Sequence, residues 1–378
     1  MNRFLFSIVN GERNDWIAVI VRMPLLFFSL FYGLVVKIIL LGYQSGVFKR
    51  NVLPVPVVSV GNLTVGGSGK TPVCIFLAKQ LLAQNVKPVI LTRGYRSGGK
   101  KNIGDPSMRT TAMAVGFSQD SASLTGMPVG LHESDEVKLL KESLKDVPVV
   151  VNPNRYQGGL EAIEQYHPDV ILLDDGFQHW KLKRDLDVLL IDCANPFGNE
   201  HVLPAGILRE YISGIKRSGL IILTKTDFGN VSQLRADIER WYPGIPIAEA
   251  VHQPISLTEL YTQQEHPLNK IICPVVAFCG IGEPLSFKAS LTTVGADVKE
   301  FIPFMDHHEY DFNDMMTIKS VCDQLGVRTL VTTRKDAVKL NSYQDFWRGY
   351  TLYALNVQIE VTKGLNEIKS KLDHLLRR

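Results

Sequence analysis

Short apolar runs alternate with helical patterns along most of this chain. After an apolar N-terminal segment, the first strand is predicted at residues 55–60 and the next helix at about residues 73–84. Buried parallel strands form continuous apolar runs, and helices connect them. The pattern therefore predicts an α/β fold with a doubly wound parallel sheet. Further strands are predicted at residues 88–92, 148–151, 169–173, 187–191, 220–223, 275–278, 298–301, 329–332 and 352–355.

The first predicted strand leads into a glycine-rich turn and then a helix. The segment VGNLTVGGSGKTP, residues 60–72, carries this transition. Backbone N–H groups in such a turn surround a polyphosphate, and the helix N-terminus adds its positive end. Lys70 is expected to reach the β- and γ-phosphates, and the Thr71 hydroxyl to hold Mg²⁺. Thr64 stands where a strict P-loop has Gly, so a turn that only connects strand and helix is the alternative. Gly-Lys-Thr at the junction favours a P-loop NTPase-like core.

The alternation is interrupted around residues 252–272 and then starts again. Beyond the interruption, helices are predicted at residues 285–294 and 312–324. At 378 residues the chain is long enough for two domains. We predict three parts: an N-terminal membrane-associated hydrophobic helix in residues 1–50, a P-loop core domain in residues 51–255, and a smaller C-terminal α/β domain in residues 270–378.

Residues 16–41 form a strongly apolar segment. Arg22 and Lys37 interrupt it and leave 14 residues between them without charge, fewer than the roughly 20 that a membrane-spanning helix needs. Pro24 and Gly33 also weaken a single continuous helix. A helix lying in the membrane interface is favoured. A single span with its charges near the two faces, or a buried core helix, stays open.

Charge and cysteine content limit the classes of function. The net charge is +3, and residues 1–50 carry six Lys and Arg against two acidic residues. No basic stripe with interleaved aromatic residues follows, which argues against nucleic acid as a partner. An anionic phosphate or lipid surface fits the charge better. The five cysteines form no CxxC pair, which argues against a zinc site or a disulfide framework and suits a reducing compartment.

Two carboxylates end the apolar strand at residues 169–173. In P-loop proteins an acidic residue at such a strand end meets the Mg²⁺ that the P-loop Thr holds. Asp174 and Asp175 would point to opposite faces if the strand continued, so that one could bind metal while the other orients a ligand. A turn without a functional role is the alternative.

Three further segments carry candidate chemistry. Arg209 could neutralise charge on a transferring phosphoryl group, or form a surface ion pair with Glu210. The acidic and histidine cluster at residues 306–309 favours a proton-handling His held by a carboxylate over a metal site. The residues Ser134 to Glu136 could simply cap a helix. TKTD, at residues 224–227, lies at a strand end where GTPases read guanine, which keeps a membrane-associated P-loop GTPase as an alternative.

Taken together, these segments resemble the tetraacyldisaccharide 4′-kinase family of Gram-negative bacteria. The resemblance covers residues 60–340, and the apolar N-terminal segment is similar to the family's membrane helix. The matching motifs, in order, are VGNLTVGGSGKTP, LTRGYRS, LLDDGFQH, PFGNEHVLPAGILRE, AFCGIG, FMDHHEYD and TTRKDAVKL.

The resemblance implies a reaction and a location. The reaction is phosphorylation, with ATP and Mg²⁺, of the 4′-hydroxyl of an acylated glucosamine disaccharide 1-phosphate in lipid A biosynthesis. The implied partners are this lipid and an anionic membrane surface, at the cytoplasmic face of the bacterial inner membrane. Neither nucleic acid nor an obligate protein partner is expected.

The resemblance also implies roles for individual residues. Activation of the sugar hydroxyl and the lining of the transfer site fall to Asp135, His307, Arg209 and Glu210. Nucleotide binding falls to Thr64, Val65, Gly66, Gly67, Ser68, Gly69, Lys70, Thr71 and Gln178. The metal is expected at Thr71, Asp174 and Asp175, and the disaccharide near Tyr95.

Two departures from the family pattern are visible. Ser134 and Val137 replace the Gly and Pro of a Gly-Asp-Glu-Pro motif. Arg334 stands where the family usually has Glu in Thr-Glu-Lys-Asp-Ala, so no role is assigned to Lys335 or Asp336.

Overall fold

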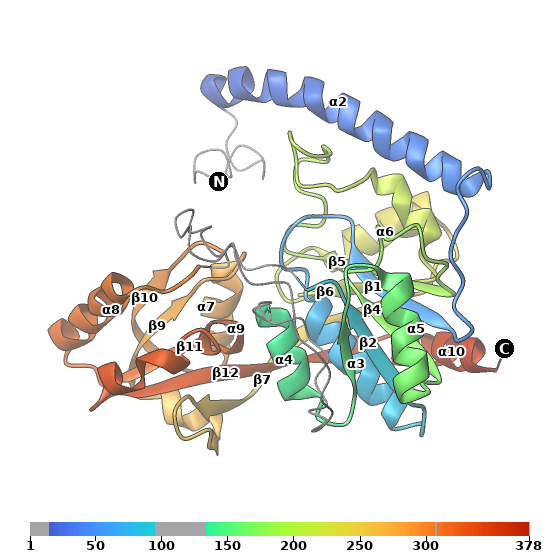
Figure 1. Ribbon diagram of the computed structural model, residues 1–378. Coiled ribbons are helices and arrows are strands. Elements are labelled where there is room, and N and C mark those ends of the chain that lie inside the picture. Colours follow the sequence, from blue (N-terminus) through green and yellow to red (C-terminus); the bar gives the residue numbers. More distant parts are fainter. Residues whose placement is uncertain (1–14, 95–133, 307, 378) are drawn as a thin grey trace, which may run out of the picture.

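The computed structural model describes residues 15–94, 134–306 and 308–377 (Figure 1). Its centre is one twelve-stranded sheet in the order β10-β9-β11-β12-β7-β6-β5-β1-β4-β2-β3, with β8 paired to β7. All neighbouring strands run parallel except β12 with β7 and β8 with β7. The predicted α/β fold with a mostly parallel sheet is therefore confirmed.

The strands and helices have the following bounds. The strands are β1 (Val57–Asn62), β2 (Pro88–Thr92), β3 (Val149–Val151), β4 (Val170–Asp174), β5 (Leu186–Asp192), β6 (Leu220–Thr224), β7 (Ile247–Glu259), β8 (Glu265–His266), β9 (Pro274–Cys279), β10 (Asp297–Pro303), β11 (Thr329–Thr333) and β12 (Thr351–Lys363). The helices are α2 (Trp16–Gln44), α3 (Lys70–Leu82), α4 (Asp135–Ser143), α5 (Arg155–Tyr166), α6 (Val231–Trp241), α7 (Pro284–Thr293), α8 (Phe312–Leu325), α9 (Arg334–Ala337) and α10 (Leu365–Leu376), with short 3₁₀ turns η2 (Ile212–Arg217), η3 (Leu268–Ile271) and η4 (Asn341–Trp347).

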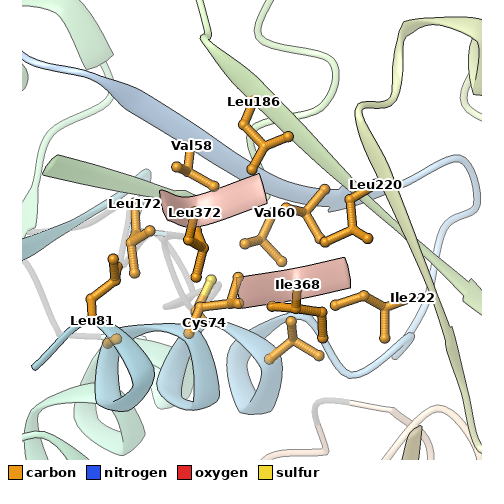
Figure 2. Packing of buried hydrophobic residues seen from close by; sticks show 14 of the residues in the cluster. Val58, Val60, Cys74, Leu81, Leu172, Leu186, Leu220, Ile222, Ile368 and Leu372 are labelled. Atoms are coloured by element: carbon orange, nitrogen blue, oxygen red, sulfur yellow. The ribbon is translucent and has the colours of Figure 1, made fainter. Parts of the chain in front are cut away.

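Helices cover both faces of the sheet around β1. Successive strand residues face opposite sides, so Val58 and Val60 of β1 pack with α3, α4 and α10 on one face. Figure 2 shows this cluster, in which Cys74 and Leu81 of α3 and Leu372 of α10 meet the strand side chains. The other face of the sheet packs against α5 and α6. All residues of β1 and β4 are buried, which is why both strands are mostly apolar.

Strands β7 and β12 connect the core to a second α/β unit formed by β9, β10, β11, α7 and α8. Both connecting strands are 13 residues long and pair antiparallel. The interruption predicted around residues 252–272 thus begins within β7, and the sheet continues across it. The division into residues 51–255 and 270–378 stays a prediction.

The N-terminal segment is one unbroken helix, α2, of 29 residues with Pro24 inside it. The prediction that Pro24 and Gly33 weaken a continuous helix was wrong. Most of its large apolar side chains are exposed, including Trp16, Met23 and Phe27, so the interpretation as a buried core helix was also wrong. Figure 1 shows α2 as a long rod at the top of the view, outside the layers that cover the sheet. By length and composition it is the one candidate membrane span among the described residues.

Candidate active site

The turn between β1 and α3 has the geometry of a phosphate-binding loop. Gly66 and Gly69 take φ angles of +115° and +81°, which residues with a Cβ rarely adopt. A Cβ at Gly69 would also lie 2.8 Å from Nε2 of His252. Lys70 is the first residue of α3, and its ammonium donates to Gly66 O at 3.2 Å and to Asn62 Oδ1 at 3.4 Å. The lysine is therefore folded back over the loop.

The loop is held from one side by the segment before Arg209. Val65 N donates to Ile207 O at 2.8 Å, and Arg209 N donates to Leu63 O at 2.7 Å. Thr64 is buried and accepts from Asn62 Nδ2 at 3.1 Å. Thr64 and Val65 thus join the P-loop to this segment, whereas Gly66, Gly67, Ser68, Gly69, Lys70 and Thr71 line the open cleft.

Asp174 ends β4 directly beside β1, where it pairs in register with Val60. The carboxyl is buried and accepts from Cys74 Sγ at 3.7 Å. Burial, together with the neighbouring charge of Asp175, raises the pKa of Asp174 to about 6. A carboxylate that is costly to keep charged is ready to be neutralised by a cation.

Asp175 leaves the strand with a φ angle of +54°. The strand ends at Asp174, so the condition for the expected opposite orientation is not met, and both Asp174 and Asp175 line the cleft. Arg209 Nη1 lies 2.8 Å and 2.9 Å from the two oxygens of Asp175, and Lys70 Nζ lies 3.9 Å away. Burial alone would raise the pKa of Asp175, but Lys70 and Arg209 together lower it below its usual value.

The pKa of Lys70 is lowered too, with burial as the main cause. Burial lowers the pKa of its ammonium, and Arg209 lowers it further, while Asp175 opposes the shift. Lys70, Arg209 and Asp175 therefore interact as one cluster of charges beside the P-loop. The cluster holds two positive charges and one negative charge, so a bound phosphate would balance the remaining positive charge.

Glu210 takes no part in the cleft. Its side chain is fully buried and paired with Arg217, at 2.7 Å between Nη1 and Oε2. Gln178 Nε2 donates to Glu210 Oε1 at 2.9 Å and to Asn62 O at 2.8 Å, so Glu210 holds Gln178 from behind. The surface ion pair considered for Arg209 and Glu210 is absent among the described contacts, since each residue pairs with a different partner. Nothing in the sequence around Arg217 pointed to this role.

The helix α2 is attached to the same segment. Its buried positions Ser29, Gly33 and Val36 share one face. The Ser29 hydroxyl donates to Val202 O at 2.8 Å and accepts from Ala205 N at 2.9 Å. The Tyr32 hydroxyl donates to Arg209 O at 2.8 Å. The apolar helix and the arginine over the cleft are thus in direct contact.

The TKTD segment contacts the P-loop, where Thr224 Oγ1 donates to Ser68 O at 3.2 Å. Lys225 is buried and pairs with Asp192 at 2.5 Å and with Glu283 of the second unit. Burial opposes its charge, but these two carboxylates raise the pKa of Lys225. His252, beside Gly69, was not predicted; burial lowers its pKa to about 4, so it is neutral near pH 7.

The cleft between the P-loop core and the second unit has a volume of about 1350 Å³. Its floor is the P-loop with Asp174, Asp175 and Arg209, and its opposite wall includes Glu283, Asp306 and Lys335. Tyr95 and His307 lie outside the described residues, as does the side chain of Asp135. The backbone of Asp135 begins α4, where Ser134 accepts from Val137 N at 3.4 Å, so Ser134 is the helix N-cap.

The described residues contain no group of three or more His, Cys, Asp or Glu side chains placed to hold a metal by themselves. Mg²⁺ typically takes one or two carboxylates and completes its shell with water and substrate phosphate. Thr71 and Asp174 suit that mode. Phosphoryl transfer depends on positioning and on neutralising charge, and the cations and acids here are arranged for both. The fold and the cleft define a P-loop phosphotransferase.

Comparisons with known proteins identify the kind of phosphotransferase. The family model of the tetraacyldisaccharide-1-P 4′-kinases matches residues 21–377. The chain is 30% identical to a tetraacyldisaccharide 4′-kinase of Halothermothrix orenii over 96% of this chain and 94% of that protein. It is 34% identical to the Geobacter sulfurreducens enzyme of the same name, over 90% of each chain. A crystal structure of LpxK from Aquifex aeolicus in complex with ATP superposes with a TM-score of 0.66 at 30% identity, covering 94% of this chain and 99% of that one.

The chain belongs to the tetraacyldisaccharide-1-P 4′-kinase family. The predicted activity, phosphorylation of the 4′-hydroxyl of a tetraacyldisaccharide 1-phosphate in lipid A biosynthesis, is confirmed, and the alternative of a GTPase is not supported.

Proposed function

We propose that the cleft binds ATP and Mg²⁺ on the P-loop and transfers the γ-phosphoryl group to a lipid acceptor that approaches along α2. The observation that carries this proposal is the contact of Arg209 with Asp175 at 2.8 Å, directly above Lys70. It supports the proposal because two cations and an acid beside the P-loop could neutralise and orient the transferring group of a bound nucleotide.

The P-loop residues fit a polyphosphate. The Ser68 hydroxyl is buried and has no hydrogen-bond partner among the described residues, in a loop whose glycine backbone lines the cleft. A buried hydroxyl without a partner costs stability unless a ligand supplies one. Thr71 and Asp174 would hold Mg²⁺, and Mg²⁺ would neutralise charge on the phosphates. Lys70 would bind the β- and γ-phosphates, with Gln178 held nearby by Glu210.

Arg209 has a second task. Its guanidinium donates to both carboxylate oxygens of Asp175, which holds it at the cleft. When the nucleotide binds, the guanidinium can neutralise charge that develops on the transferring group. Asp175 would then orient both Arg209 and Lys70.

Acceptor activation is assigned to Asp135 and His307. A sugar hydroxyl is a poor nucleophile, and a positioned base must remove its proton as the new P–O bond forms. Asp135 begins α4 in the core, and His307 follows Asp306 in the second unit. The two residues belong to segments on different sides of the cleft, and we propose that the disaccharide binds between these segments, with Tyr95.

The exposed apolar face of α2 is proposed to bind the cytoplasmic leaflet of the inner membrane. Met23, Phe27, Leu30 and Leu34 are each more than half exposed, and the segment up to residue 50 is positively charged. Such a helix binds anionic lipid through apolar burial and charge. An acylated substrate could then reach the cleft without leaving the bilayer surface.

Double-variant kinetics test the activating pair. Asp135→Ala and His307→Ala should each lower kcat by about 100-fold while sparing ATP binding. The double variant should be little worse than the worse single variant, since residues that act as one unit are not additive. Fully multiplicative losses at unchanged ATP affinity would overturn the pairing.

A further inference from the structure

Lys335 lines the cleft and contacts residues from both of its walls. It belongs to the short helix α9 of the second unit. Its Nζ is 3.3 Å from Asp306 Oδ1 and 3.7 Å from Glu136 Oε1. Asp306 is in the second unit, whereas Glu136 is in the first turn of α4 in the core. One ammonium therefore contacts carboxylates from both sides of the cleft.

These two carboxylates are sequence neighbours of the proposed activating pair. Glu136 follows Asp135, and Asp306 precedes His307. Two carboxylates that each lie within 4 Å of the same ammonium would repel each other if that positive charge were removed. Lys335 is only 22% exposed, so solvent screens its interactions less than it would at an open surface. Its charge favours the approach of the segments that carry Asp135 and His307.

The base of this lysine is rigidly held. Asp336 is fully buried and accepts from Gly280 N at 2.9 Å and from Thr333 Oγ1 at 2.7 Å. The Thr333 side chain in turn accepts from Asp336 N at 3.1 Å and caps α9. Within the TTRKDAVKL motif, Asp336 thus fixes the position of α9 through its buried hydrogen bonds. Lys335, the residue before it, lines the cleft.

A second ion pair ties α9 to α4. Arg334 Nη2 lies 3.1 Å from Glu142 Oε2 in the last part of α4, and Arg334 Nη1 donates to Asn356 at 3.1 Å. Arg334 is the residue that departs from the usual family motif, and in this chain it meets an acid on the partner helix. Both ion pairs hold α4, but only the ion pair of Lys335 lies at the N-terminal end of this helix, where Asp135 is the first residue.

We propose that Lys335 is a positioning residue, which draws the first turn of α4 and the segment at Asp306 together and so aligns Asp135 with His307. This inference rests on the proposed roles of Asp135 and His307. It assigns Lys335 no contact with the reacting atoms. Its effect is on the geometry of the cleft, where a displacement of about 1 Å is enough to cost roughly 100-fold in rate.

The test combines Lys335→Met with variants of the pair, in the full-length protein. Methionine keeps most of the side chain's length and removes the charge. Lys335→Met should lower kcat by about 10-fold to 100-fold and leave the dissociation constant for Mg-ATP unchanged. Lys335→Arg should restore most of kcat. Lys335→Met added to Asp135→Asn should cause no further loss, because Lys335 acts only through the pair.

The matched control is Lys299→Met, which removes another lysine of the second unit paired with an aspartate, at 2.9 Å from Asp297. It should behave as the unmodified protein. Three results would overturn the role of Lys335: unchanged kcat in Lys335→Met, a loss that multiplies with that of Asp135→Asn, or a kcat loss that Lys335→Arg fails to restore. Failure of the activating pair gives a different pattern, in which Asp135→Asn and His307→Ala by themselves retain kcat.

Discussion

Arg209 and Asp175 face each other over the P-loop, with Nη1 of the arginine 2.8 Å and 2.9 Å from the two carboxylate oxygens. The carboxylate comes from the end of β4, and the arginine from the segment that binds the loop through Leu63 and Val65. The pair therefore forms only when two separate parts of the core are correctly folded. It fixes a positive group beside the P-loop.

Replacement of this arginine should impair the chemical step. Arg209→Met should lower kcat by about 100-fold to 1,000-fold, the range for loss of one charge-stabilising group. ATP affinity should fall far less, because Lys70 and the loop backbone remain. Steady-state kinetics with a nucleotide-binding titration would check this, with Arg235→Met as a control that removes an arginine paired with Glu249 outside the cleft. An equal loss of ATP affinity and kcat/KM, with kcat intact, would show that Arg209 only binds nucleotide.

Attachment of α2 to the site should be measurable through Tyr32. Tyr32→Phe removes the hydrogen bond to the Arg209 carbonyl, a loss of about 1 kcal/mol for a bond of this kind. We expect a modest decrease in kcat, of roughly 3-fold to 10-fold, without loss of vesicle binding. Tyr43→Phe is the control, since Tyr43 is in the same helix and packs edge-on against Phe48. A decrease in vesicle binding with unchanged kcat would show that α2 acts on the membrane alone.

His252 predicts a pH dependence of stability. Burial lowers its pKa in the folded state to about 4, below the usual value of about 6.5 in the unfolded chain. As the pH falls below about 6.5, the unfolded state binds the proton first, so this histidine's contribution to stability declines until about pH 4 and then levels off. Partial exposure reduces the expected difference to about 2 kcal/mol.

Urea denaturation at pH 7.5 and pH 4.5 would measure this effect. His252→Gln should lose less stability between the two values than the unmodified protein. His201→Gln, at an exposed histidine, serves as the control and should follow the unmodified protein. Parallel curves for His252→Gln and the unmodified protein would mean that His252 is protonated equally in both states.

The sequence predicted most of the core because its strands are buried on both faces. The strand at residues 88–92 coincides with β2, and the helix predicted at 312–324 nearly coincides with α8. Strand β12 was predicted only over residues 352–355, although it extends to Lys363. Its second half alternates between buried and exposed residues, such as Ile359 and Glu360, so no apolar run marks it.

The site was predictable where a local motif carried it. The P-loop and the Asp174–Asp175 pair follow strand ends that the apolar pattern reveals. Contacts between distant segments left no local signal. The pairing of Glu210 with Arg217, the burial of His252 beside Gly69 and the bridge of Lys335 between Glu136 and Asp306 depend on how the units pack. The continuous helix through Pro24 was also not predicted. Proline favours a break, and a helix that is apolar on its exposed side shows no amphipathic pattern that would argue for continuity.

Mass spectrometry of a tetraacyldisaccharide 1-phosphate acceptor, incubated with the protein and Mg-ATP, measures the proposed transfer itself. The acceptor should gain one phosphate, and ATP consumption should require the acceptor. An acceptor that lacks the 4′-hydroxyl should gain none. Lys70→Met should reduce the gain by about 100-fold or more, because the lysine over the P-loop carries charge that the transferring group needs. An unmodified acceptor, ATP consumption without acceptor, or full activity in Lys70→Met would contradict a kinase centred on this loop.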